Sequence, residues 1–120
     1  MDVEIEHRSA HLYVRLSGEY EEEIPPEGRP ASLAKACRDG NYRCLLLDAR
    51  DLAGEPGPGV YFRFGEETAR AFAFNVTRIA IVGSTQRARQ LSVIKSIVTL
   101  QGGVLMIFTD INEAQEWLMR

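Results

Sequence analysis

The chain has 120 residues, of which 45% are hydrophobic and 26% are charged. This is an ordinary composition for a folded globular protein, and it excludes a disordered, collagen-like or coiled-coil chain. Because independent domains seldom share so short a chain, we expect one domain over residues 1–120. The net charge of -3 has the wrong sign for attraction to nucleic acid, so we expect no nucleic-acid partner.

The sequence contains no segment that predicts membrane insertion or secretion. No apolar run approaches the roughly 18 residues that a membrane span requires. The first residues, Met1 to Glu4, lack the basic and apolar regions of a signal peptide. We therefore expect a cytoplasmic protein with no membrane span. Cys37 and Cys44 match no C-x-x-C spacing, which predicts two reduced, packed thiols.

The N-terminal region has the period-two alternation of strands. Val3–Glu6 and Leu12–Leu16 alternate apolar with polar residues, and the short segment 8–10 between them suits a hairpin turn. We therefore predict two antiparallel strands at the start of the chain. Residues 19–30 combine an acidic run with three prolines, which predicts a loop.

Three short, unbroken apolar runs predict strands that are buried on both faces of a parallel sheet. They are Cys44–Leu47, Ile79–Val82 and Val104–Phe108. The helical patterns are Ala31–Cys37, Tyr61–Phe74, Gln86–Leu100 and a last helix with Asp110 as its N-cap. Strands that alternate with helices call for right-handed crossovers. The predicted class is α/β, with a five-stranded mixed sheet, an N-terminal antiparallel hairpin and about four helices.

Three motifs within this order of elements resemble a known family. They read Leu45-Leu46-Leu47-Asp48, then Gly65-Glu66-Glu67-Thr68-Ala69-Arg70, and finally Phe108-Thr109-Asp110 followed by Ala114, Trp117 and Leu118. In these motifs the chain is similar to small stand-alone bacterial STAS-like proteins, and the likeness spans nearly its whole length. The resemblance implies a single domain of STAS-like topology.

The same resemblance implies regulation through protein partners. In the anti-sigma-factor antagonists of this family, a serine at the start of the helix after the third strand is phosphorylated, which switches partner binding. The matching residues 54–59 read GEPGPG and contain neither Ser nor Thr. The first hydroxyl groups beyond them belong to Tyr61 and Thr68. We therefore expect no phosphoserine switch by that route.

An aromatic cluster lies on the helix predicted after the third strand. The apolar arc of this helix is wider than one contact with a sheet requires. Because exposed aromatic patches commonly mark interfaces, we predict an interaction surface. It consists of Tyr61, Phe62, Phe64 and Phe74. The alternative is that all these rings pack in the core or beneath residues 54–59.

The loop after the fourth strand is the candidate for anion binding. Ligands of open α/β sheets usually lie beyond the carboxyl ends of the strands, and the N-terminus of a helix favours negative charge. The candidate residues are Gly83, Ser84, Thr85 and Arg87, which would hold a nucleotide, a phosphorylated metabolite or a lipid. The alternative is that Ser84 or Thr85 only caps the helix, because no phosphate-binding glycine motif accompanies them.

Two further groups of polar residues are interpreted as structural. Asp48, Asp51 and Asp110 could converge like the metal-binding acids of receiver domains, but no lysine follows the fifth strand. Asp48 is better explained as a strand-end residue and Asp110 as a helix cap. His7 and His11 are too few for a zinc site, so we expect surface histidines. We expect neither a metal nor a cofactor.

No arrangement of residues points to catalysis. The sequence has no G-x-S-x-G elbow and no other signature of a Ser-His-Asp site. We therefore expect a non-catalytic regulatory or protein-interaction module that binds a protein partner or a second copy of itself. The alternative function is a domain that binds a small anionic ligand at its strand-end loops.

Overall fold

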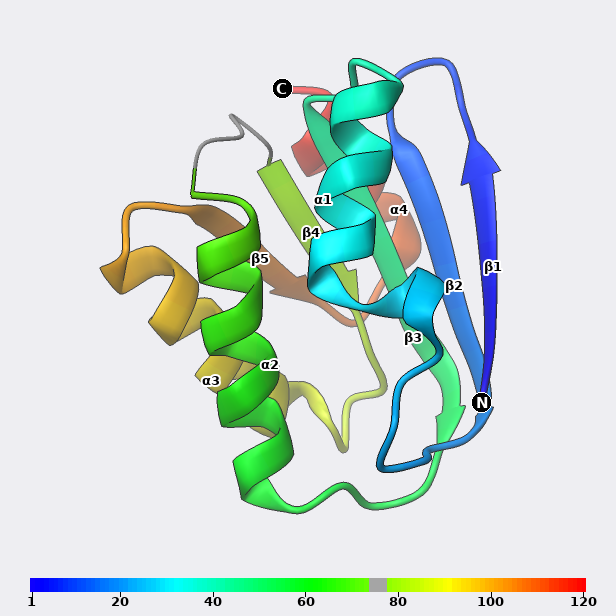
Figure 1. Cartoon of the computed structure of the whole chain (residues 1–120), viewed down its shortest axis with the longest axis vertical. Coiled ribbons are helices and arrows are strands. Elements are labelled where there is room, and N and C mark those ends of the chain that lie inside the picture. The colour runs from blue at the N-terminus through cyan, green and yellow to red at the C-terminus, as the bar shows by residue number, and fades with distance from the viewer. Residues whose placement is uncertain (74–77) are drawn as a thin grey trace.

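The computed structural model describes residues 1–73 and 78–120 of the chain. Figure 1 shows how its elements are arranged. In chain order they are β1 (Asp2–His7), β2 (Leu12–Glu19), the 3-10 helix η1 (Pro26–Gly28), α1 (Pro30–Asp39), β3 (Cys44–Ala53), α2 (Pro58–Ala71), β4 (Arg78–Val82), α3 (Ala88–Leu100), β5 (Val104–Phe108) and α4 (Ile111–Leu118). Within the described ranges, no helix has the length and apolar character needed to cross a membrane.

The strands form one five-stranded sheet in sequence order, β1-β2-β3-β4-β5. β1 runs antiparallel to β2, and each later strand runs parallel to the one before it. The three apolar runs lie side by side, with Leu45 opposite Ile79 and Ile79 opposite Leu105. The expected α/β class, mixed sheet and N-terminal hairpin are therefore confirmed.

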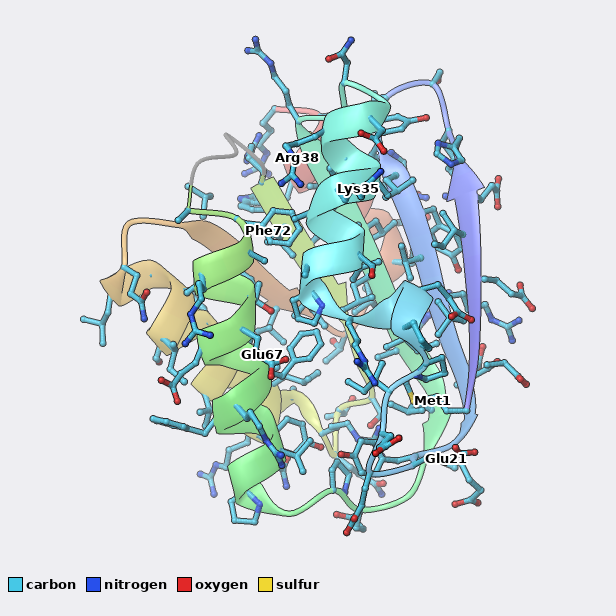
Figure 2. The ribbon with its side chains drawn as sticks, in the orientation of Figure 1. Met1, Glu21, Lys35, Arg38, Glu67 and Phe72 are labelled. Atoms are coloured by element: carbon cyan, nitrogen blue, oxygen red, sulfur yellow. The ribbon has the colours of Figure 1, made fainter. Side chains whose placement is uncertain are left out.

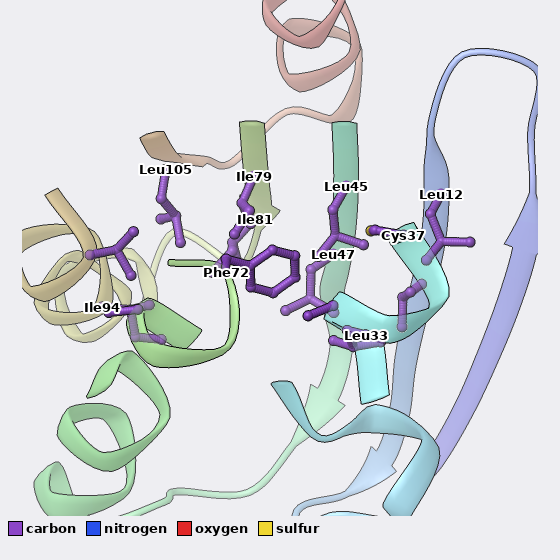
Figure 3. Close-up of a cluster of buried hydrophobic side chains, with 14 of the residues drawn as sticks. Leu12, Leu33, Cys37, Leu45, Leu47, Phe72, Ile79, Ile81, Ile94 and Leu105 are labelled. Atoms are coloured by element: carbon purple, nitrogen blue, oxygen red, sulfur yellow. The ribbon is translucent and has the colours of Figure 1, made fainter. Parts of the chain in front are cut away.

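Helices cover both faces of the sheet, which explains why its central strands are apolar throughout. α1, α2 and α3 lie on one face, and α4 lies on the other against β3, β4 and β5. Successive residues of a strand point to opposite faces. Leu45 and Leu47 therefore join the larger core under α1, α2 and α3, whereas Leu46 joins the smaller core under α4. Figure 3 shows the larger core.

α2 and α3 approach each other closely at a glycine. A Cβ atom on Gly65 would lie 2.9 Å from Ile97 Cδ1 and 3.3 Å from Ile94 Cα. Because Ile94 Cα is a backbone atom, the two helices would have to move apart to admit a larger side chain. Gly65 thus sets the distance between these helices.

The third strand is longer than its apolar run. β3 continues beyond Leu47 to Ala53 because the second half of β2 pairs with it, with Gly18 opposite Leu52. The prediction that Asp48 ends this strand is therefore wrong, since Asp48 lies within β3 and is 0% exposed. Pairing with a neighbouring strand, and not hydrophobicity, decides where β3 ends.

The connection from β3 to α2 is correspondingly short. It spans residues 54–57, because α2 begins at Pro58 and not at the expected Tyr61. Proline suits the first turn of a helix, where its missing N–H would have no intrahelical partner. α2 ends at Ala71, and Phe74, the expected last residue of this helix, lies outside the described residues.

Candidate functional site

The connections that follow β2, β3 and β4 gather at one edge of the sheet. Because these strands are parallel, their carboxyl ends point the same way. Figure 1 shows the three connections together at the lower end of the molecule. Open α/β sheets usually bind their ligands at this edge.

A cavity of about 70 Å³ lies at this edge. On the sheet side it is lined by Leu16 of β2, by Leu47, Ala49 and Leu52 of β3, and by Ile81 of β4. On the helix side it is lined by Val60, Tyr61 and Phe64 of α2 and by Leu91 and Ile94 of α3. The lining is almost entirely apolar, so the cavity suits a hydrocarbon group better than a polar one.

The segment after β2 and the N-terminus complete the lining. Tyr20, Ile24 and Met1 all contribute to it. The Tyr20 N–H donates a hydrogen bond of 2.8 Å to the carbonyl of Ala53, which holds this segment against the end of β3. The amino group of Met1 lies 2.9 Å from the Glu21 carboxylate, and Figure 2 shows both residues at the lower end of the sheet.

Arg87 provides the sole charged side chain among the described residues that line the cavity. Its Nη2 donates a hydrogen bond to the carbonyl of Gly54, which ties the β3–α2 connection to the start of α3. Its Nη1 is buried and has no hydrogen-bond partner within residues 1–73 and 78–120. Leaving such a donor unpaired costs free energy, so Nη1 would gain from contact with an acceptor.

A second hollow, of about 40 Å³, also reaches Arg87. Its lining is mostly polar and consists of Glu55, Tyr61, Ser84, Gln86, Arg87 and Gln90. Tyr61 and Arg87 line both hollows and thus lie in the wall between a polar and an apolar space. Burial raises the pKa of Tyr61, although the nearby charge of Arg87 acts in the opposite direction. The Tyr61 hydroxyl is therefore neutral at physiological pH.

The residues of the predicted anion-binding loop lie between β4 and α3. They are Gly83, Ser84, Thr85 and Arg87. The Gly83 N–H donates to the carbonyl of Phe108 at 3.0 Å, and the Arg87 N–H donates to the carbonyl of Ser84 at 3.0 Å. Both donors are thus already used inside the protein. The Arg87 N–H also donates to the Ser84 hydroxyl at 3.3 Å, as in the alternative in which Ser84 caps the helix.

Gly83 instead has a role in packing. A Cβ atom at this position would collide with Cδ1 of Leu91. The absence of a side chain therefore lets α3 lie close to the end of β4. The sequence pattern places Gly83 at the right edge of the sheet but does not reveal this packing role.

The predicted aromatic surface is exposed at one of its described positions. Phe62 is 53% exposed, whereas Tyr61 is 8% exposed and lines the cavity. Phe64 is half-buried against the larger core, and Phe74 lies outside the described residues. Successive helical residues are turned by about 100°, which is why Phe62 faces outward while Tyr61 faces the sheet. Tyr61 thus belongs to the interior and not to an exposed surface.

The opposite face of the sheet carries a buried carboxylate. Asp48 accepts a hydrogen bond of 2.6 Å from the Tyr13 hydroxyl. It also accepts hydrogen bonds from Nε and Nη2 of Arg50, at 2.9 and 2.8 Å. Burial alone would raise the pKa of Asp48, but the hydrogen bonds from Arg50 and Tyr13 outweigh it and lower the pKa. Asp48 is thus held ionised by partners from two strands.

The other two acids considered as metal ligands have partners of their own. Asp51 pairs with Arg15 at 2.8 Å. Asp110 accepts hydrogen bonds from the backbone N–H groups of Asn112 and Glu113, at 2.8 and 3.2 Å. The interpretation of Asp110 as the N-cap of the last helix is therefore confirmed.

The two histidines differ in their environments. His7 is exposed, and its ring centroid lies 5.7 Å from that of Tyr42. His11 is 9% exposed, so the expectation of a surface histidine is wrong for this residue. His11 directly precedes β2, whose first residues are buried, so the backbone places His11 beside the core. Burial lowers the pKa of His11, and the charge of Arg8 lowers it further.

Both cysteines are free, as expected. Cys37 is buried in the larger core, and burial raises the pKa of its thiol to about 11. Cys44 is half-buried, and its thiol donates a hydrogen bond of 3.4 Å to the carbonyl of Leu118. Neither thiol is activated as a nucleophile, because burial also raises the pKa of Cys44.

Among solved structures, the chain matches the crystal structure of an anti-sigma factor antagonist from Mycobacterium paratuberculosis with a TM-score of 0.68. The match covers 99% of this chain and 94% of that chain. The chain has a STAS-like fold. The sequence identity is 12%, so the likeness concerns the fold alone. No family model matches the STAS-like chain, and no curated protein matches it in sequence.

Proposed function

We propose that this STAS-like chain is a non-catalytic regulatory module that binds a protein partner or a second copy of itself. The structural neighbour is named an anti-sigma factor antagonist, a name that describes action on another protein. The observation that carries the proposal is Phe62, an aromatic residue that is 53% exposed in the first turns of α2. Aromatic side chains are enriched at the centres of interfaces, where they anchor the partner.

The surface near the start of α2 is charged, as the rim of an interface commonly is. A hollow of about 200 Å³ lies between α2 and the segment after β2. Its charged lining residues are Glu22, Glu23, Arg29, Arg63 and Glu67, of which Glu67 is labelled in Figure 2. Both signs of charge are present, which supports recognition of a partner with a complementary pattern.

The proposed module works without a phosphoserine switch. Residues 54–59 contain no hydroxyl side chain. The first hydroxyl groups beyond them belong to Tyr61 and Thr68, and both residues are buried. A kinase could not reach either hydroxyl in the folded chain, which supports control of partner binding by another route.

The substitution Phe62→Asp tests the interaction surface. We expect it to abolish self-association in light scattering, or partner capture in pull-down experiments, while the circular dichroism spectrum is unchanged. Leu100→Asp is the matched control, because Leu100 is also apolar and exposed but lies at the end of α3. Association that persists in a folded Phe62→Asp variant contradicts the proposal.

As a second candidate, we propose that the chain binds a small anionic ligand through Arg87. The observation that favours this function is the position of Arg87, which lines the mostly polar hollow together with Ser84, Gln86 and Gln90. A thermal-shift screen against nucleotides, phosphorylated metabolites and acyl ligands tests it. A ligand at 100 times its Kd adds about 2.7 kcal/mol to the free energy of unfolding. The absence of a shift with every anion argues against this function.

A further inference from the structure

The apolar cavity and the charged hollow beside α2 are neighbours. Four residues line both spaces, namely Tyr20 and Ile24 of the segment after β2 and Val60 and Phe64 of α2. All four residues are half-buried, and the cavity is not sealed from solvent. The cavity thus lies on the inner side of these residues and the hollow on their outer side.

The inner space accepts a short hydrocarbon group. Its volume is about 70 Å³, and its lining is almost entirely apolar. A cavity of about 150 Å³ with a similar lining accommodates benzene, which has six carbon atoms, so half that volume accommodates roughly three or four. A charged group placed inside would lose its hydration without gaining a partner. The charged part of a ligand must therefore remain in the outer hollow.

The outer hollow offers unpaired charges of both signs. Its volume is about 200 Å³, and its charged lining residues are Arg29, Arg63, Glu22, Glu23 and Glu67. In the described parts of the chain, no ion pair joins two of these side chains, and Arg29 Nε donates to the carbonyl of Ile24 at 3.1 Å. A ligand with one charge would be attracted by one set of groups and repelled by the other. A ligand that carries both charges matches both sets.

α2 presents two of these opposite charges side by side. Arg63 and Glu67 are four residues apart, so they lie on one face of the helix with their Cβ atoms about 5–6 Å from each other. Val60 and Phe64 lie on the same face, one turn before each of them. The ammonium and carboxylate groups of an α-amino acid are attached to one carbon atom, so together they can contact two neighbouring side chains.

These observations fit a ligand that is zwitterionic at one end and apolar at the other. We propose that the hollow and the cavity together bind a free α-amino acid with a branched aliphatic side chain of about three or four carbon atoms. The alkyl group passes between Ile24 and Phe64 into the cavity. The carboxylate accepts hydrogen bonds from Arg63, and the ammonium group donates to Glu67. The inference goes beyond both proposed functions, because it requires neither Phe62 nor Arg87.

Isothermal titration calorimetry of the full chain with L-leucine tests the proposal. We expect saturable binding with one site per chain. Glycine keeps both charges without the tail, isovalerate lacks the ammonium group, and 3-methylbutylamine lacks the carboxylate. L-Phenylalanine keeps both charges but carries a side chain too large for the cavity. We expect each of these four compounds to bind at least tenfold more weakly than L-leucine.

Variants of the two spaces provide the second arm of the test. Ala49 lines the cavity and not the hollow, so Ala49→Leu fills the space of the alkyl group. Arg63→Gln and Glu67→Gln each remove one charge from the hollow. We expect all three variants to bind L-leucine at least tenfold more weakly. Arg70→Gln and Glu66→Gln are the matched controls and should bind normally, because these residues are exposed on α2 and line neither space.

Each contrary outcome overturns a particular part of the proposal. Isovalerate or 3-methylbutylamine binding as tightly as L-leucine would exclude recognition of a zwitterion, and glycine binding as tightly would exclude a role for the cavity. An equal loss of binding in Arg63→Gln and Arg70→Gln would exclude the hollow. Because Arg63 and Glu67 are exposed, their variants decide the question even if Ala49→Leu fails to fold. Neither the association tested with Phe62→Asp nor the anion screen depends on these results.

Discussion

The Tyr13 hydroxyl donates a hydrogen bond of 2.6 Å to Oδ2 of Asp48, which joins β2 to β3 on the face of the sheet that carries α4. Asp48 itself is completely buried, and its other side-chain partner, Arg50, reaches the surface. A buried carboxylate is stable only while its hydrogen bonds are made. Several properties of the folded chain therefore depend on this pair.

Tyr13→Phe removes one donor to Asp48 and leaves the charge in place. Hydrogen bonds to charged groups contribute about 1.5–3 kcal/mol, so we expect the free energy of unfolding in urea to fall by about this amount. Tyr42→Phe is the matched control, because the Tyr42 side chain is half-buried and its hydroxyl makes no hydrogen bond within the described residues. An equal loss in both variants would rule out a special role for the Tyr13 hydroxyl.

The lowered pKa of Asp48 predicts a loss of stability in acid. An aspartate in the unfolded chain titrates near pH 3.9, and the folded chain holds this carboxyl ionised to lower pH. Its contribution is therefore present above about pH 3.9 and is lost as the pH falls through the folded-state pKa. Urea unfolding at a series of pH values should show a weaker acid dependence in Asp48→Asn than in the unchanged chain. Identical slopes would refute this assignment.

The Tyr13 hydroxyl predicts an alkaline transition. Burial and the hydrogen bond to Asp48 raise the pKa of Tyr13 to about 12. Tyrosine in the unfolded chain titrates near pH 10, so the stabilising contribution is complete below about pH 10 and is lost as the pH rises through the folded-state value. In a pH titration followed by phenolate absorbance, part of the signal should appear only near pH 12. In Tyr13→Phe this high-pH part should be smaller by the absorbance of one tyrosine. A high-pH part of unchanged size in that variant would contradict the prediction.

Because α2 and α3 approach closely at Gly65, we expect a larger residue at this position to destabilise the folded chain. Gly65→Val would press against Ile97 and against the backbone at Ile94. We expect it to lower the free energy of unfolding by about 1–3 kcal/mol. Gly59→Ala is the control in the same helix, since a Cβ there meets nothing within 4 Å. Gly59→Ala should raise the free energy of unfolding by about 0.5–1 kcal/mol. If both variants instead lower it by a similar amount, the loss in Gly65→Val does not come from the contact between α2 and α3.

The Asp110 N-cap of α4 should contribute measurably to the stability of the folded chain. Asp110→Ala removes the acceptor of two backbone N–H groups, which should cost about 0.5–2 kcal/mol. Asp110→Asn keeps a capping oxygen and should recover most of the loss. Thermal unfolding followed by circular dichroism distinguishes the two variants, and equal midpoints for both would show that the cap contributes little.

The candidate site could be predicted in its location but not in its chemistry. The carboxyl ends of the parallel strands and Arg87 were identifiable from the order of elements, because this order requires the loops to meet at one edge. The apolar cavity could not be predicted, since its lining combines residues from β2, β3, β4, α2 and α3. The hydrogen bonds that occupy the Gly83 N–H and Arg87 Nη2 also involve residues distant in sequence.

The sequence by itself determined the α/β class, the hairpin, the three adjacent apolar strands and the Asp110 cap. Each of these depends on a local pattern of burial or on a backbone contact within a few residues. Only the tertiary structure decided that β3 runs on to Ala53, that Asp48 is buried, and that Tyr61 faces inward while Phe62 faces outward. These features arise because pairing and packing between distant segments override the preference of each residue for water or for the core.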